Sequence, residues 1–176
     1  MNYFATPVSS FESFNNYNQT VGKGVSLSTI ADIEPSFQIF SPQSEKIHLW
    51  GIKGDKKTRW VKANIGDILF FYHNKNMISY CTIFNKFENS KLAETLWGSF
   101  ENIHYSKYTW PLILLLSEPT ECHIPFIKFN KIIGYKENYF LRSFFKLPDR
   151  FAKYLGDNYS NIKEFASKES TTHKNL

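Results

Sequence analysis

The chain has 176 residues, enough for one domain with a substantial core. Its 21 Lys and Arg side chains against 16 Asp and Glu give a formal net charge of +5, which permits a nucleic-acid partner without requiring one. No apolar run is long enough to span a bilayer, and no signal-peptide pattern opens the chain, so no membrane partner is expected. Two cysteines without a close-spaced motif are typical of a reducing compartment, which predicts a cytoplasmic location.

The first 44 residues are rich in Ser, Asn and Gln, with scattered Phe and Tyr side chains. This composition predicts one or two short helices and then an extended connection, held on the rest of the protein by the aromatic rings. Residues 1–44 are therefore predicted to be an N-terminal extension packed on a domain that spans residues 45–156.

The clearest strand patterns follow from residue 47. Residues 47–52 alternate as a half-buried strand does, and residues 68–73 form a strongly aromatic strand after the turn at Gly66 and Asp67. The polar residues 74–76 predict a hairpin, with its return strand over residues 77–87.

The second half of the domain is predicted to alternate helices with one more strand. A helix is expected over residues 91–97, capped by Ser90 and stopped by Gly98. A strand over 110–116 follows, and then two helices, over 124–133 with Pro125 in the first turn and over 142–154 with an interruption near Pro148. Residues 157–176 are polar and are predicted to be a tail or linker. These elements predict an α+β domain, a small curved β-barrel or sheet with helices packed around its openings.

The sequence motifs of the common enzyme classes are missing. Gly22-Lys23-Gly24 lacks the spacing of a phosphate-binding loop, and there is no G-x-S-x-G elbow or zinc-ligand spacing. Asp67 follows a glycine, and its expected role is to form the turn through hydrogen bonds to the backbone. We therefore predict no catalytic residue, no metal site and no cofactor.

Aromatic side chains make up 18% of the chain, and several lie beside predicted strand ends. Taken one at a time, each ring is best explained as part of the core. Taken together, two or three rings converging on the mouth of a barrel predict a pocket in which a flat base stacks. The candidates for this base pocket are Trp50, Trp60, Tyr72, Tyr105 and Trp110, with Tyr108 as a further ring near a strand end. His73, at the end of its strand, is either a structural histidine or a hydrogen-bond donor to a base edge.

A run of basic residues follows Trp50 in the sequence. Such a run is usually a solvated loop, but beside a base pocket it predicts contacts to a phosphate backbone. The candidates are Lys53, Lys56, Lys57, Arg59 and Lys62, together with Lys75 in the hairpin; Lys107, Arg142 and Arg150 are weaker.

Trp50-Gly51-Ile52-Lys53, followed by Ile65-Gly66-Asp67 and a strand that ends Phe71-Tyr72-His73-Asn74, resembles the EVE branch of the PUA-like superfamily, which is related to YTH domains. The resemblance spans about residues 46–155, and its specific part is 50–83; Asn74 stands where the family often has Ser. It implies a PUA-like barrel that flips a modified base into an aromatic pocket, to which Trp50, Gly51, Ile52, Lys53, Tyr72 and His73 are the transferable positions. Similar domains lie at the N-terminus of McrB-type subunits of modification-dependent restriction systems, which implies association with restriction motor and nuclease subunits.

The leading hypothesis is thus a non-enzymatic DNA-binding domain that reads a methylated base, with DNA preferred over RNA. The alternative is an RNA-binding PUA-like module of an RNA-modification or translation factor. An amide-hydrolysing barrel is a third hypothesis, but the Lys-Thr-Glu cluster that it requires is not evident. Replacing Trp50 by Ala is expected to abolish selectivity and spare the fold, unless the ring belongs to the core.

Overall fold

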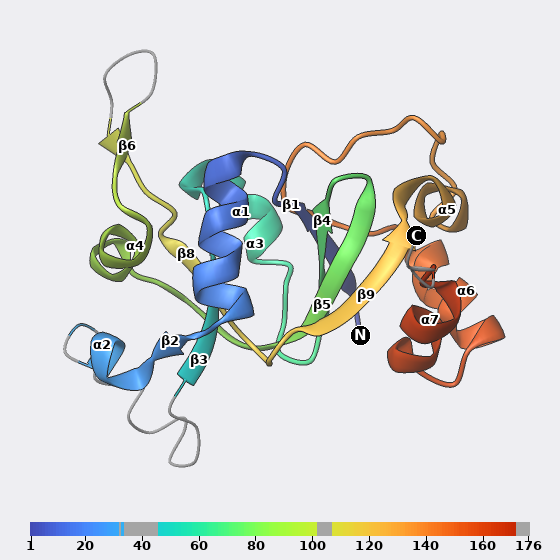
Figure 1. The fold of residues 1–176 in the computed structure, drawn as a ribbon, viewed down its shortest axis with the longest axis horizontal. Helices are drawn as coiled ribbons and strands as arrows, with labels where there is room; N and C mark the ends of the chain where they lie inside the picture. Colours follow the sequence, from blue (N-terminus) through green and yellow to red (C-terminus); the bar gives the residue numbers. More distant parts are fainter. Residues whose placement is uncertain (32, 34–45, 102–106, 172–176) are drawn as a thin grey trace, which may run out of the picture.

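The computed structural model describes residues 1–31, 33, 46–101 and 107–171 (Figure 1). Most of its strands form one sheet in the order β10-β1-β4-β5-β8-β3-β2, with β9 also paired to β5, and β6 and β7 form a separate small hairpin. The strands are β1 (Tyr3–Pro7), β2 (Val25–Ser26), β3 (Lys46–Ile52), β4 (Ile68–His73), β5 (Asn76–Glu88), β6 (Phe100–Glu101), β7 (Lys107–Tyr108), β8 (Leu112–Leu116), β9 (Thr120–Pro125) and β10 (Phe145–Lys146). The helices are α1 (Phe11–Tyr17), α2 (Leu27–Ala31), α3 (Lys57–Trp60), α4 (Ser90–Trp97), α5 (Phe126–Ile132), α6 (Asp149–Asn158) and α7 (Ile162–Glu169), with a π-helical turn η1 (Asn18–Gly22) and a 3-10 turn η3 (Gly54–Lys56).

The predicted hairpin of β4 and β5 is confirmed. His73 pairs with Asn76, which leaves Asn74 and Lys75 as a two-residue turn. Both turn residues have positive φ, 43° and 63°, as the tight turns that match the twist of a hairpin require. The antiparallel pairing continues down to Ile68 opposite Thr82, so this hairpin forms the centre of the sheet.

Strand β4 is buried on both faces and separates two hydrophobic clusters. Leu69 and Phe71 pack into the cluster that contains β3, β8 and α4, whereas Phe70 and Tyr72 pack into the cluster beneath α5, α6 and α7. This division follows from the two-residue period of a strand, which sends neighbouring side chains to opposite faces. In Figure 1, α5, α6 and α7 lie on one side of the β4–β5 hairpin, and α1, α3 and α4 lie on the other.

The first residues belong to the sheet, which differs from the predicted extension over residues 1–44. β1 runs parallel to β4 and antiparallel to β10, and it therefore lies inside the sheet. Phe4 and Ala5 in β1 are fully buried. The polar composition of the following residues concealed this strand, and the expected connection over 34–45 lies outside the described residues.

Two helix boundaries differ from the prediction for local reasons. The cap of α4 is Asn89, whose side chain accepts a hydrogen bond from the amide of Leu92, so Ser90 is the first helical residue. Helix α5 begins only at Phe126, because residues 120–125 pair with β5 as strand β9. Cys122 and Ile124 are buried and alternate with outward-facing neighbours, as in a strand, so residues 124 and 125 belong to β9 and not to the predicted helix.

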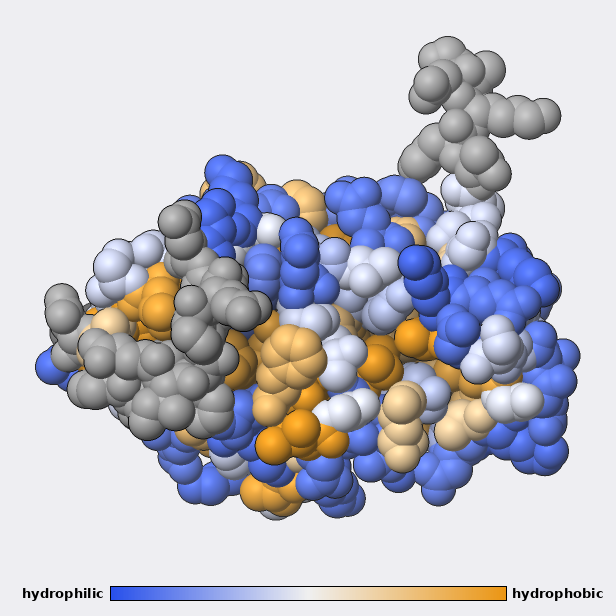
Figure 2. Space-filling model, turned by 90° about the horizontal axis from the view of Figure 1, so that it is seen from below, coloured by the Kyte–Doolittle hydropathy of each residue, from blue (hydrophilic) through white to orange (hydrophobic). Residues whose placement is uncertain are grey.

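The end of the domain also differs from the prediction. Residues 145 and 146 form β10 beside β1, and the helix α6 starts at Asp149, directly after Pro148. The stretch predicted as a tail or linker contains α7, whose Phe165 is fully buried. The two helices are amphipathic, and Figure 2 shows a largely hydrophilic surface over the end of the molecule where they lie. Among the described residues, no helix has the length and apolar character needed to cross a membrane.

Asp67 has the structural role that its place in the turn predicts. Its carboxylate is buried and accepts hydrogen bonds from the backbone amides of Asn2, at 2.6 Å, and Asn64, at 2.9 Å. It therefore ties the first residues of the chain to the turn that starts β4.

Replacing Asp67 by Ala is expected to lower the free energy of unfolding by about 1–3 kcal/mol, because it leaves two amide donors without their acceptor. Urea denaturation measures the change. Asp157 of α6 is the control, since its carboxylate forms a surface ion pair with Lys153. Asp157→Ala is expected to cost at most about 1 kcal/mol. Equal losses in the two variants would contradict the structural role of Asp67.

Candidate functional site

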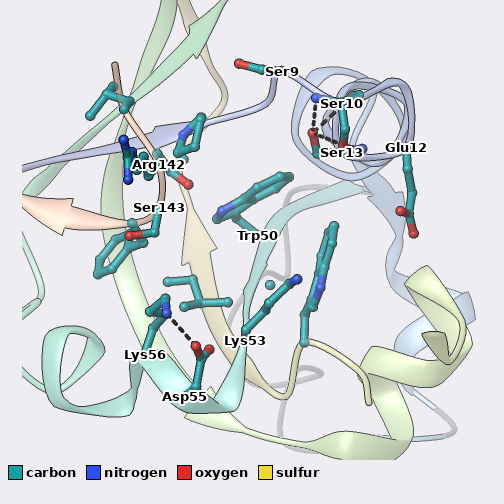
Figure 3. A pocket seen from close by; sticks show the side chains of 17 residues that line it. Ser9, Ser10, Glu12, Ser13, Trp50, Lys53, Asp55, Lys56, Arg142 and Ser143 are labelled. Carbon is teal, nitrogen blue, oxygen red and sulfur yellow. Dashed lines mark hydrogen bonds and ion pairs between the residues drawn. The ribbon is translucent and has the colours of Figure 1, made fainter. Parts of the chain in front are cut away.

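A cavity of about 490 Å³ lies where the end of β3, the start of α1 and the segment 141–144 meet (Figure 3). We call it the tryptophan cavity. This size is within the range of small-molecule and cofactor sites. It is lined by residues from four parts of the chain, namely Thr6, Pro7, Ser9, Ser10, Glu12 and Ser13; Trp50, Gly51, Ile52, Lys53, Asp55 and Lys56; Trp110; and Leu141, Arg142, Ser143 and Phe144.

The apolar floor of the tryptophan cavity is made by Trp50, Trp110 and Phe144. The two indoles come from β3 and from the segment just before β8, which pair in the sheet. Their ring centroids lie 5.7 Å apart with planes tilted by 50°, so the rings contact each other and leave no slot between them. Their exposed fractions are only 4% and 8%. A flat ligand would therefore stack on one side of this aromatic pair and not between the two rings.

The walls of the tryptophan cavity are polar. Ser10 caps α1 and forms a capping box with Ser13, and their hydroxyl oxygens lie 2.8 Å apart. Glu12 is exposed on the same helix, and Figure 3 shows its carboxylate beside the cavity. On the opposite side Asp55 forms an ion pair with Lys56. Hydroxyl, carboxylate and ammonium groups thus surround the aromatic floor.

Gly51 is needed because two tryptophan side chains approach the backbone of β3 closely. A Cβ atom at this position would lie 2.5 Å from Cζ3 of Trp97 and 2.8 Å from Cβ of Trp110. Trp97 is buried, and its indole N–H donates to Oγ1 of Thr20 at 3.3 Å. The ring of Trp97 is therefore held in place, and a side chain at residue 51 has no room.

Gly51→Ala is expected to lower the free energy of unfolding by about 1–3 kcal/mol through overpacking. Gly156 in α6 supplies the matched control, because a Cβ there would meet no atom within 4 Å. Gly156→Ala is expected to raise stability by about 0.5–1 kcal/mol, since alanine is the better helix former. Thermal or urea unfolding of both variants measures the difference. A Gly51→Ala protein as stable as the natural chain would show that Trp97 can move aside.

Four of the predicted base-pocket residues line the tryptophan cavity, namely Trp50, Gly51, Ile52 and Trp110. Tyr72 does not, because strand alternation turns it to the opposite face, where its ring lies 4.3 Å from that of Phe126. The β4 ring that lies on the same face of the sheet as Trp50 is that of Phe71, and the centroids of these two rings are 5.4 Å apart.

His73 has the structural role that was one of its two expected alternatives. Its Nδ1 donates to the carbonyl oxygen of Val8 at 2.8 Å, and its ring stacks on Phe14 with centroids 3.8 Å apart. Both contacts hold α1 and the segment before it against the end of β4. His73 does not line the tryptophan cavity.

Trp60 also lies outside the tryptophan cavity. Its ring is buried, and the ammonium group of Lys86 lies 5.0 Å above the ring centroid while it donates to the carbonyl oxygen of Val61 at 2.8 Å. Burial lowers the pKa of Lys86. Tyr105, the remaining predicted ring, lies outside the described residues.

The predicted phosphate-binding residues divide into separate groups. Lys53 and Lys56 line the tryptophan cavity, and Arg59 and Lys62 line a second cavity beside it. Lys57 instead pairs with Glu88 at 2.5 Å. Lys75, in the β4–β5 turn, lines neither of these two cavities.

Sequence reasoning missed two segments of the site. The first is Ser9–Ser13, where a serine cap before an aromatic residue was a usable signal for a helix start. The second is the segment 141–144, most of which the sequence predicts as helix; of its residues only Arg142 is a sequence candidate, and a weaker one, for phosphate binding. Among residues 1–31, 33, 46–101 and 107–171, no three His, Cys, Asp or Glu side chains form a group that could hold a metal ion.

The fold of this chain is similar to that of a domain whose structure was solved in complex with DNA. The N-terminal domain of Thermococcus gammatolerans McrB, solved bound to m5C DNA, is similar with a TM-score of 0.67 and 17% sequence identity. The match covers 89% of this chain and 96% of that one. It confirms the predicted α+β fold and the predicted likeness to McrB-type domains at the level of structure. No protein-family model matches the sequence, and no curated protein matches it.

Proposed function

We propose that this chain is a DNA-binding domain that reads a modified base by receiving the extruded base in the tryptophan cavity. The observation that carries the proposal is the position of Trp50 and Trp110, which form the aromatic floor of a polar-walled cavity. Aromatic side chains stack on bases of any sequence, with about 1–3 kcal/mol per base. A methyl group on the base would add apolar contact with the same floor.

The polar walls suit the recognition of a base edge. The carboxylates of Glu12 and Asp55 can accept hydrogen bonds from the exocyclic amino group of cytosine or adenine. Because the indoles expose little of their surface, these polar groups would contribute most of the selectivity among bases. A base inside a duplex cannot reach such a cavity, so binding requires that the nucleotide be flipped out.

The fold supports DNA as the partner. The similar McrB domain was solved bound to m5C DNA, and the chain described here covers nearly all of it. On this ground we favour DNA over RNA and binding over catalysis. Association with the motor and nuclease subunits of a restriction system is a further prediction from the resemblance.

The test is a binding panel at one fixed salt concentration. Matched duplexes carry m5C, N6-methyladenine or no modification, and RNA of the same sequence is included. We expect one modified duplex to bind at least about tenfold more tightly than the plain duplex, which corresponds to about 1.4 kcal/mol. Equal affinity across the modified and plain DNA would contradict base reading. Preferential binding of RNA would instead favour the RNA-binding alternative.

A further inference from the structure

A second cavity, of about 420 Å³, adjoins the tryptophan cavity. Arg142 and Ser143 line both. The second cavity is otherwise lined by Arg59, Lys62, Tyr139, Phe145 and Lys146, and we call it the basic pocket. Its lining has four cationic side chains and no carboxylate. The tryptophan cavity differs, because Glu12 and Asp55 are among its lining residues.

The cations of the basic pocket keep most of their charge uncompensated. Arg59 donates from Nη1 to Oγ of Ser143 at 2.6 Å and to the carbonyl oxygen of Phe144 at 3.2 Å, both neutral acceptors. Lys146 pairs with Asp149 at 2.9 Å, but that carboxylate side chain is 88% exposed, so the pair is a weak surface one. Lys62 and Arg142 form no ion pair with any residue that the structure describes.

Two other lysines of the predicted phosphate-binding run form surface ion pairs with carboxylates that are also partly exposed. Lys56 pairs with Asp55, and Lys57 pairs with Glu88 of β5. The cations Arg59, Lys62 and Arg142 form no ion pair with any described residue, and all three line the basic pocket. The contacts of Arg59 fix these two parts of the chain against each other.

We propose that the basic pocket binds the phosphodiester attached to the nucleotide whose base occupies the tryptophan cavity, with Arg142 contacting that phosphate. This inference rests on the proposed function and extends it to the backbone of the same nucleotide. A nucleotide joins its base to its phosphate through one sugar, and the two cavities have Arg142 and Ser143 in common among their lining residues. The guanidinium group suits this role, because its planar array of donors matches two phosphate oxygens at once.

The test pairs a protein variant with a DNA variant. Duplexes carry one m5C and a single neutral methylphosphonate linkage, placed either next to the m5C or five nucleotides away. The natural chain is compared with Arg142→Gln, whose exposed position should leave the fold intact, and with Lys153→Gln. Lys153 lies on α6 and lines neither cavity. Its replacement by Gln removes one positive charge, as Arg142→Gln does. The affinity of each protein for the m5C duplex and for the plain duplex is measured at several salt concentrations.

For the natural chain, we expect the adjacent methylphosphonate to weaken binding by about tenfold, the scale of a charge-assisted hydrogen bond, and the distant one to have little effect. Arg142→Gln should weaken binding of the m5C duplex without a methylphosphonate to a similar extent. It should also lower by about 1 the steepness with which the logarithm of the affinity falls against the logarithm of the salt concentration (the salt slope). The adjacent methylphosphonate should then have no further effect on binding by this variant. Lys153→Gln should keep the sensitivity to the adjacent methylphosphonate.

Independent, additive effects of the two changes would overturn the phosphate assignment, as would an unchanged salt slope in Arg142→Gln. The proposed function fails separately, when m5C, N6-methyladenine and plain duplexes bind alike. In that case a lowered slope in Arg142→Gln would still support a phosphate site. A natural chain that binds none of these duplexes would contradict both proposals.

Discussion

Trp50→Ala is expected to lower the free energy of unfolding by about 3–5 kcal/mol, as large-to-small changes of a buried indole do. Trp50 is 4% exposed and packs at its edge against Phe71, with centroids 5.4 Å apart, and against Trp110. Removing the ring leaves a void in the hydrophobic cluster that contains β3, β8 and α4. Chemical denaturation followed by circular dichroism measures the loss.

This expectation changes how Trp50 has to be tested. A loss of binding in Trp50→Ala would reflect lost stability as well as a lost base contact, so the alanine variant cannot separate the two roles. Trp50→Phe retains an aromatic ring and should lose less stability than the alanine variant. A Trp50→Ala protein as stable as the natural chain would contradict the packing described for this ring.

Phe165→Ala in α7 is the second change with a large expected effect, also about 3–5 kcal/mol. Phe165 is fully buried, and its ring lies 5.5 Å from that of Phe151 and 5.3 Å from that of Tyr159. Helix α7 is further fixed to β9, since Oγ of Ser170 accepts from the amide of His123 at 2.9 Å. Removing the Phe165 ring should therefore destabilise the whole hydrophobic cluster beneath α5, α6 and α7. The midpoint and slope of urea unfolding measure this effect.

The matched control for Phe165→Ala is Ser167→Ala, an exposed position on the same helix. A change there is expected to alter stability by less than about 0.5 kcal/mol. If Phe165→Ala were equally mild, residues 162–169 would be a dispensable appendage, as their polar composition had suggested. Truncation after residue 160 should then be tolerated as well.

The sequence indicated the central hairpin well because its signals are local. The turn at Gly66 and Asp67, the aromatic run of β4 and the polar pair at Asn74 and Lys75 each specify structure through neighbouring residues. It could not show which ring of β4 faces Trp50. Because both faces of this strand are buried, residues 68–72 form one apolar run without polar alternation, and the choice between Phe71 and Tyr72 depends on tertiary packing.

Long-range pairing explains the rest of what sequence analysis missed in the site. The segment before Pro148 has apolar spacing that favours a helix, but residues 145 and 146 pair with β1, more than 130 positions away. That pairing brings Arg142 to the two cavities. The ion pair of Lys57 in α3 likewise depends on Glu88 in β5, and no local sequence pattern reveals this pairing.

The central claim is that the tryptophan cavity receives an extruded base, and a crystal structure of this chain bound to the modified duplex that it binds most tightly tests it most directly. We predict that the modified base lies outside the duplex stack, against Trp50 and Trp110, with its exocyclic amino group toward Glu12 or Asp55. A complex in which that base stays stacked in the duplex, with the tryptophan cavity facing away from the DNA, would contradict the claim.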